Sequence, residues 1–357
     1  MSKNCAKRKP KIMNHVTFNK LFFNNDEMCR NFFLNVFHPL GLVCPKCGCV
    51  HFDLLKCRNN VYSCSKCSHQ IYLFAGTIFQ DNKLPLYTLL YGIFLFVTSK
   101  KGISAEELAS EIGVNRKTAQ LLCKKIRYLM SLDNDCFDLE SKFIEVDGFF
   151  IGGKTHNGKR GLGTNQQPFL LALGTDRLNN YPNKMKVLKV TSENKSEVKR
   201  LFQYIHYDKD TTVCTDGDQS YLYLKDKVHL MHGVIDYNDE NHLMYWLNIQ
   251  ISNIKSNIDG IYHGIPKKYL NEYIQEHVWR FNHRYKGINL MFSMMRIISY
   301  SVVMTRKMLK AYYSTSSVSD GLWNFFSNNI FLYVTVDFGI FKSFAVLRSD
   351  ISSKKIH

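Results

Sequence analysis

Two kinds of side chain in this sequence could bind metal ions: paired cysteines near its start and isolated aspartates further on. The cysteines form two CxxC pairs, Cys44 with Cys47 and Cys64 with Cys67, separated by sixteen residues. Four thiolates at this spacing can surround one tetrahedral Zn²⁺ ion. Free buried thiols would not explain the pairing. The sequence therefore predicts a structural zinc ribbon over residues 40–80, holding one Zn²⁺ per chain.

The segment between the cysteine pairs must fold back on itself to bring them together. Gly48 and Ser68 suit the tight turn that follows each pair. The intervening residues alternate enough to form a short β-hairpin with Asn59 and Asn60 at its turn. A closed structural site needs only four ligands, so the other potential ligands nearby are expected to be bystanders: Cys49, His51, Cys57 and His69.

Two aspartates further along the chain lie in apolar, strand-like runs. Asp147 is in the middle of KFIEVDGFFIGG, and Asp216 closes the strand-like run TTVCTDG, where Gly217 follows it. A buried carboxylate is costly unless it binds a charge, and two carboxylates forced together repel unless a divalent cation lies between them. Paired cations at such a site activate a water or a 3′-hydroxyl in phosphodiester chemistry. Either aspartate alone could be a turn cap or an ion-pair partner, but together they predict a Mg²⁺ or Mn²⁺ site. Glu145 is expected on the opposite face of the strand and Asp218 in the turn, so neither is assigned a role.

The elements that must position these aspartates occur in an informative order. Strands are predicted over residues 142–153, 169–176, 185–191, 211–217 and 227–233, and helices over 192–205, 242–257 and 267–284. Three successive strands, a helix and further strands, followed by helices, is the order of an RNase H-like fold. The predicted fold class is therefore an α/β catalytic domain of the RNase H-like, retroviral-integrase-like type.

A second pair of helices is predicted between the zinc ribbon and these strands. Ser104 and Glu107 form a capping box that begins one helix, Gly113 ends it, and Asn115 begins the next. Basic helix pairs are common, but beside a zinc ribbon this one predicts a DNA-binding helix-turn-helix over residues 84–132. Three side chains would face outward where such a motif contacts DNA: Arg116, Lys117 and Gln120.

The charge and composition indicate a partner and a location. The net charge is +17, and residues 1–135 carry 19 Lys and Arg against 9 Asp and Glu. A solvated basic surface would explain this excess, but nucleic acid is the commonest polyanion inside a cell. The apolar run 85–98 is shorter than the roughly 20 residues of a membrane span, and no secretory signal is recognisable at the start. We therefore expect an intracellular protein that binds DNA and no membrane, in the bacterial nucleoid or cytoplasm or in a eukaryotic nucleus.

A set of longer motifs occurs in a fixed order along the chain. They are CPKCG, YSCSKCSHQIYLFAGTIF, GISAEELASEIGVNRKTAQ, VDGFFIGGK, TDGDQSY, WLNIQISNIKSNIDGIYHGIPKKYL and NEYIQEHVWRFNHR. Together they resemble the zinc-ribbon transposases of bacterial insertion sequences, which are related to the eukaryotic Merlin transposases. That family has two catalytic aspartates, then Glu, Asn or His, then a lysine seven positions later. The resemblance implies a DDE/DDNK-type site made of Asp147, Asp216, Asn248 and Lys255.

The resemblance gives a role to the helix predicted over 242–257. Seven residues at 100° each return to within 20° of the start, so Asn248 and Lys255 share one helix face, roughly 10 Å apart. Asn248 would then offer a neutral oxygen to the Mg²⁺ and Lys255 would contact a DNA phosphate. Without the resemblance, Asn248 would be the polar surface of an ordinary helix. The sequence departs from the family's pattern at Gly148, where an acid is usual, and at His277, where an aromatic residue is usual.

The predicted function is that of a DNA transposase, which binds the ends of a mobile element and catalyses metal-dependent strand cleavage and strand transfer. Its expected partners are double-stranded terminal-repeat and target DNA and further copies of itself in a synaptic complex. The alternative is a catalytically silent or domesticated DNA-binding protein descended from a transposase, but both aspartates are retained. A structural zinc protein of RNA metabolism would not explain residues 142–284.

The predicted domain boundaries follow from these assignments. In order, they are a basic arm and lead-in helix at 1–39, the zinc ribbon at 40–80, the helix-turn-helix at 84–132, the transposase domain at 140–290, and a helix with an unassigned tail at 291–357.

Overall fold

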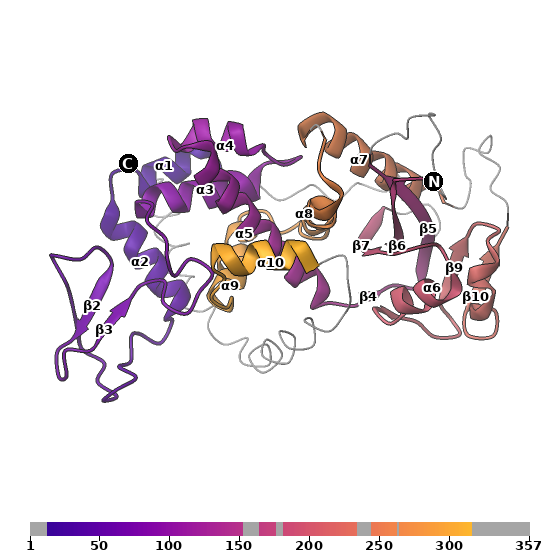
Figure 1. Ribbon diagram of the computed structural model, residues 1–357. Helices are drawn as coiled ribbons and strands as arrows, with labels where there is room; N and C mark the ends of the chain where they lie inside the picture. The colour runs from indigo at the N-terminus through magenta and orange to yellow at the C-terminus, as the bar shows by residue number, and fades with distance from the viewer. Residues whose placement is uncertain (1–12, 153–163, 176–180, 234–243, 263, 316–357) are drawn as a thin grey trace, which may run out of the picture. The chain divides into compact units, whose positions relative to one another are not determined.

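The computed structural model describes residues 13–152, 164–175, 181–233, 244–262 and 264–315 (Figure 1). The chain divides into two compact units, and each is made of two separate parts of the sequence. One unit comprises Met1–Lys20 with Tyr87–Met294, and the other comprises Leu21–Leu86 with Met295–His357. The predicted basic arm lies largely outside the described residues, as does the apolar tail beyond residue 315.

The larger unit is built on a five-stranded mixed sheet. Its strands are β5 (Phe143–Ile151), β6 (Gln167–Thr175), β7 (Pro182–Lys189), β9 (Thr212–Thr215) and β10 (His229–His232). They are arranged in the order β10-β9-β5-β6-β7, in which β5, β6 and β7 pair antiparallel while β9 is parallel to both β5 and β10. This sheet matches the predicted RNase H-like fold. Its first strand along the chain, β5, lies at the centre, β6 and β7 extend one edge, and β9 and β10 extend the other.

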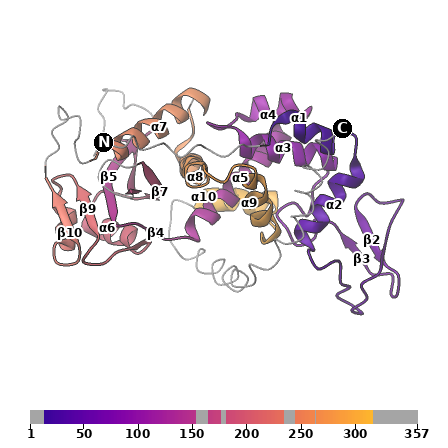
Figure 2. The same ribbon diagram turned by 180° about the vertical axis from the view of Figure 1, so that it is seen from behind.

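Helices cover both faces of this sheet (Figures 1 and 2). On one face, α6 (Lys195–Phe202) packs against Ile144 and Val146 of β5. On the other face, α7 (Tyr245–Tyr262) and α8 (Leu270–Asn282) pack against Phe149 and Ile151 of β5. Alternation along β5 therefore directs its even-numbered side chains to α6 and its odd-numbered ones to α7 and α8.

The predicted helix pair is present as α4 (Ala105–Ile112) and α5 (Arg116–Asp135). Ser104 accepts a hydrogen bond from the N–H of Glu107 and begins α4, and Gly113 ends it with φ +67°. Asn115 accepts from the N–H of Thr118 and begins α5. The second half of α5 is buried and packs against α8, so this helix belongs to the same compact unit as the sheet.

The described chain contains several further helices and one short strand pair. They are α1 (His15–Phe22), α3 (Leu86–Thr98), α9 (Asn289–Ser299), α10 (Arg306–Thr315), the strand pair β4 (Leu139–Glu140) and β8 (Ile205–His206), and the 3₁₀ helices Gln219–Leu224 and Lys267–Tyr269. Within the described ranges, no helix is both long and apolar enough to cross a membrane.

The smaller unit contains the predicted hairpin. It begins with α2 (Asp26–Phe37), followed by the antiparallel strands β1 (Phe52–Leu54), β2 (Val61–Cys64) and β3 (Gln70–Tyr72). Asn60 has φ +61° in the turn between β1 and β2, a conformation that asparagine tolerates better than most residues. Phe33 of α2 packs edge-on against Phe74, with ring centroids 4.9 Å apart, and ties the helix to the segment after β3.

Candidate active site

The four predicted zinc ligands lie together in the smaller unit. The sulfur of Cys44 is 3.5 Å from that of Cys67, and the sulfur of Cys47 is 3.6 Å from that of Cys64. All four sulfur atoms lie within 4.8 Å of one another. A tetrahedral Zn²⁺ with bonds of about 2.3 Å needs thiolates at roughly this separation, so the donor set fits zinc.

Both cysteine pairs use the same turn. The N–H of Gly48 donates to the carbonyl of Cys44 (2.9 Å), and the N–H of Ser68 donates to that of Cys64 (2.8 Å). Gly48 has φ +67° and Ser68 has φ +57°, so each adopts the left-handed conformation of a tight turn, as predicted. Cys57 is exposed and lies outside the cluster, in agreement with its expected role as a bystander.

The predicted catalytic aspartates follow the last paired residues of two neighbouring strands. Parallel pairing of β5 with β9 runs as far as Val146 and Thr215. The next residues are Asp147, which continues along β5, and Asp216, which follows the end of β9. The sheet therefore brings the two aspartates next to each other at the end of its parallel ladder.

The surroundings of Asp147 are crowded with charge. Burial, together with the neighbouring carboxylates of Asp216 and Glu193, raises its pKa to about 7. The N–H of Gly148 donates to its Oδ1 (2.7 Å) and opposes this shift, as does the ammonium of Lys255. The pKa shift shows that a buried negative charge here is under-compensated, which is the electrostatic condition of a cation site.

Glu193 and Tyr221 also belong to this acidic cluster, and the sequence analysis missed both. Burial raises the pKa of Tyr221 well above its usual value, and so do Asp147, Asp216, Glu193 and Asp218. The tyrosine hydroxyl is therefore close to four carboxylates. The sequence analysis placed Glu193 within a helix, but α6 begins two residues later, and Asn194 caps it. Its position outside the helix frees Glu193 to reach the strand end.

The expectation for Glu145 was wrong. Residues 145 and 147 are two apart in β5, so their side chains share one face of the sheet. The N–H of Leu247, at the start of α7, donates to Oε2 of Glu145 (2.8 Å). Burial raises the pKa of Glu145 to about 7, and this hydrogen bond opposes the shift. Glu145 thus ties the first turn of α7 to the strand that carries Asp147.

Asn248 and Lys255 lie on α7, as predicted. Asn248 is in the first turn, next to Leu247, and its side-chain nitrogen is buried without a hydrogen-bond partner in the described structure. Lys255 is close enough to Asp147 to lower the pKa of that carboxyl. The structure therefore brings Asp147, Asp216 and Lys255 into one electrostatic cluster, with Asn248 at the same end of α7 as the Glu145 contact.

Two protein-family models match this chain, one over the cysteine cluster and one over the five-stranded sheet. A transposase zinc-ribbon domain matches residues 24–70, and an ISXO2-like transposase domain matches residues 140–282. Together these two models match more than half of the chain, and they place the four cysteines and the two aspartates in domains of the same kind of enzyme.

The chain belongs to the zinc-ribbon transposases with an ISXO2-like transposase domain. No curated protein matches it. Among solved structures, the transposase is similar to the Mos1 strand transfer complex, with 9% identity over 61% of this chain and 79% of the other, at a TM-score of 0.26. It is also similar to a pre-cleavage Mos1 transpososome, with 9% identity over 60% of this chain and 79% of the other, at a TM-score of 0.21.

The donor atoms of the transposase fit both metals that such an enzyme uses. The four thiolates suit a structural Zn²⁺. The carboxylates of Asp147 and Asp216 suit a hard divalent cation, and Oε1 of Glu193 is a buried oxygen without a hydrogen-bond partner in the described structure. Among the described residues, the cysteine cluster is the group of three or more potential ligands whose donor atoms all lie within 4.8 Å of one another.

The side chains predicted to contact DNA lie at the start of α5. Arg116, Lys117 and Gln120 are all exposed. The Nε of Arg116 is 3.0 Å from a carboxylate oxygen of Glu106, and both side chains are more than two-thirds exposed. An exposed pair of this kind is weak and can exchange for a phosphate at little cost.

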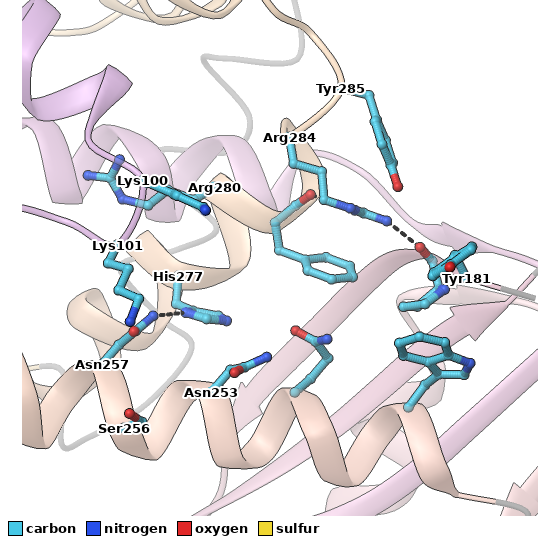
Figure 3. A pocket seen from close by; sticks show the side chains of 14 residues that line it. Lys100, Lys101, Tyr181, Asn253, Ser256, Asn257, His277, Arg280, Arg284 and Tyr285 are labelled. Atoms are coloured by element: carbon cyan, nitrogen blue, oxygen red, sulfur yellow. Dashed lines mark hydrogen bonds between the residues drawn. The ribbon is translucent and has the colours of Figure 1, made fainter. Parts of the chain in front are cut away.

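Figure 3 shows a cavity of about 510 Å³ in the transposase, whose lining includes no residue of the acidic cluster. It is lined from α7 by Trp246, Gln250, Asn253 and Asn257, which share one helix face. Asn248 and Lys255 lie on the opposite side of the same helix. Arg280, which also lines the cavity, donates to the backbone carbonyls of Phe96, Val97 and Ser99 and therefore has a structural role. The cavity holds none of the predicted catalytic residues.

Proposed function

We propose that this transposase binds the ends of a mobile element and cleaves and joins DNA strands with divalent cations held by Asp147 and Asp216. The observation that carries the proposal is their position at the end of the parallel β5–β9 ladder, where two carboxylates from distant parts of the sequence become neighbours. The raised pKa of Asp147 supports it, because a cation would relieve the repulsion.

Each residue of the site would have a distinct task. Asp147 and Asp216 would hold two Mg²⁺ or Mn²⁺ ions against the DNA backbone. When bound, these ions lower the pKa of the attacking water or 3′-hydroxyl and stabilise the leaving oxygen. Asn248 would add a neutral oxygen ligand from the first turn of α7, and Lys255 would hold a phosphate next to the ions.

DNA binding is assigned to the N-terminal part of the chain. We infer that the ribbon at 40–80 and a helix-turn-helix at 84–132 hold the terminal repeats, while residues 140–290 carry out the chemistry. Arg116, Lys117 and Gln120 would contact DNA from the exposed start of α5, where a recognition helix presents its base contacts. Transfer of two ends to a target requires at least two active sites, so we propose that the active form is an oligomer.

The central test compares cleavage with binding. Asp147→Ala and Asp216→Ala should each abolish Mg²⁺-dependent cleavage of DNA that carries the ends of the element, with binding of that DNA retained. Equal loss of both activities would indicate a folding defect. Normal cleavage by Asp216→Ala would mean that the assigned site is wrong, and absence of cleavage by the unmodified protein would favour the domesticated DNA-binding alternative.

The assignment of Asn248 is tested separately. Asn248→Ala removes an oxygen ligand and should lower cleavage far more than DNA binding. Asn248→Asp adds a carboxylate at the same reach and should lower the Mg²⁺ or Mn²⁺ concentration needed for half-maximal cleavage. If Asn248→Ala matches the parent across a metal titration, Asn248 is only helix surface.

A further inference from the structure

The side chain of Glu193 packs against the backbone of Gly148, in the space that a side chain at position 148 would fill. A Cβ atom built on Gly148 would lie 1.8 Å from Oε1 of Glu193 and 2.4 Å from its carboxyl carbon. The backbone of Gly148 does not have the positive φ that favours glycine. The missing side chain therefore serves close approach: the carboxylate of Glu193 occupies the space above the residue that follows Asp147.

Two polar side chains that follow Glu193 in the sequence, Asn194 and Glu197, have visible structural partners. Asn194 caps α6, accepting from the N–H groups of Ser196 and Glu197. Glu197 accepts from Thr191 and forms an ion pair with Arg200 at 2.9 Å. Glu193 differs, since its Oε1 is shielded from solvent and has no hydrogen-bond partner in the described structure. A carboxylate oxygen in that state is costly unless a cation reaches it.

The environment of Glu193 is anionic. Burial raises the pKa of its carboxyl, and so do Asp216 and Asp218. Glu193 in turn raises the pKa of Asp147. The carboxylates of Asp147, Asp216 and Glu193 therefore lie near enough for Asp216 and Glu193 to raise the pKa of Asp147. Carboxylate oxygens are the ligands that a hard divalent cation prefers.

We propose that Glu193 is a third carboxylate ligand of the catalytic divalent cations, supplied from the turn before α6 and admitted to the site by the absence of a side chain at Gly148. This inference rests on the proposed role of Asp147 and Asp216. It changes the expected charge of the site, because a neutral Asn248 then leaves three formal negative charges rather than two. Divalent cations should accordingly bind without DNA.

The test is calorimetric titration of Mn²⁺ into the zinc-loaded, full-length protein without DNA. Glu193→Gln keeps the shape of the side chain and should weaken Mn²⁺ binding at least tenfold, a loss of about 1.4 kcal/mol. Gly148→Ala should weaken it similarly, because its Cβ displaces the carboxylate. Asp210→Asn removes an exposed carboxylate from the same unit and should leave Mn²⁺ affinity unchanged.

A relocation experiment separates ligation from a structural role. In the double variant Gly148→Asp with Glu193→Ala, the new carboxylate stands in the vacated space, and Mn²⁺ affinity should return to within about threefold of the parent. Thermal melting without Mn²⁺ completes the test: Glu193→Gln should melt at or above the parent's temperature, since it removes an uncompensated buried charge.

The outcomes distinguish the two proposals. Parental Mn²⁺ affinity in Glu193→Gln, combined with lost binding in Asp147→Ala, would overturn the role of Glu193 and leave the proposed function intact. Parental affinity in Asp147→Ala and Asp216→Ala as well would overturn both. Lowered melting temperature in Glu193→Gln with no rescue by the double variant would make Glu193 a structural residue.

Discussion

The Nε of Arg127 in α5 donates to Oε2 of Glu276 in α8 over 2.6 Å, and each side chain is only 2% exposed. Arg280 also donates to Glu276, at 2.7 Å, and the hydroxyl of Tyr262 donates to it at 3.1 Å. Burial opposes the charge on both partners, yet the guanidinium groups of Arg127 and Arg280 lower the pKa of Glu276 below its usual value. This ion pair connects α5, the second helix of the predicted helix-turn-helix, to α8, which packs on the five-stranded sheet.

Glu276→Gln should destabilise the larger unit by about 3–5 kcal/mol, because it leaves a guanidinium buried without its counter-charge. Urea unfolding followed by circular dichroism measures the change. Asp208→Asn is the matched control, since Lys142 and Asp208 form an ion pair at 2.7 Å with both side chains more than half exposed. That substitution should change the free energy of unfolding far less, because water and salt screen an exposed pair. Equal effects of the two substitutions would contradict the structural role assigned to the buried pair.

Cys44→Ser should release zinc and unfold residues 40–80, since a structural zinc site supplies on the order of 10 kcal/mol of folding free energy. DNA binding should weaken, while the sheet should stay folded because it lies in a separate compact unit. Metal analysis and limited proteolysis measure these effects. Cys57→Ser is the control, as Cys57 is exposed and outside the cluster. Zinc retained at one equivalent in Cys44→Ser would rule out this ligand.

His277 should make stability depend on pH. Burial and, to a smaller extent, the charge of Arg280 lower its pKa to about 4, against the opposing effect of Glu276. The side-chain N–H of Asn257 donates to Nδ1 (2.9 Å), which suits a neutral imidazole. Between pH 6.5 and pH 4 the unfolded chain binds more protons than the folded one, so stability falls as the pH is lowered through this window.

His277→Gln keeps an acceptor for Asn257 and should reduce this pH dependence by on the order of 2 kcal/mol. Urea midpoints at pH 7 and pH 4.5 measure it for the parent and the variant. His229→Gln alters an exposed histidine of β10 and serves as the control. If the parent and His277→Gln lose the same stability between the two pH values, another group is responsible.

Lys117→Ala should weaken binding to all DNA sequences alike and reduce the slope of log affinity against log salt by about 1, as expected for one lost phosphate contact. Gln120→Ala should instead lower the preference for element ends over unrelated DNA. Fluorescence anisotropy at several salt concentrations distinguishes these effects. Lys209→Ala, an exposed lysine of the sheet-containing unit, should change neither quantity. No change in Lys117→Ala would remove α5 from the DNA interface.

The parts of the structure that depend on local sequence were predictable. Alternation and chain order predicted the five strands, and capping residues located the ends of the helix pair at Ser104, Gly113 and Asn115. The cysteine pairs predicted the zinc cluster, because two short turns determine its geometry. Strand alternation, helix caps and CxxC turns are each determined by residues within a few positions of one another in the sequence.

Features that join distant segments were not predictable. Glu193 reaches the acidic cluster only because Gly148, in another strand, has no side chain. The sequence of α5 is rich in basic residues, as in a helix at the surface. Arg127 is nevertheless buried, because it pairs with Glu276, which is 149 residues away in the sequence. The position of Glu145, by contrast, was predictable from the sequence. It is two residues from Asp147 in one strand, so the two side chains must point to the same face of the sheet.

The two halves of α5 have an evolutionary consequence. Its first turn exposes Lys117 and Gln120, while its second half depends on a carboxylate in α8. If recombination moved only α4 and α5 into a related protein, Arg127 would be buried there without the carboxylate of Glu276. We therefore expect the proposed DNA-reading segment to be inherited together with α8 and the sheet. New preferences for the sequence of the element ends should arise by point substitution at the start of α5, and not by transfer of the helix pair alone.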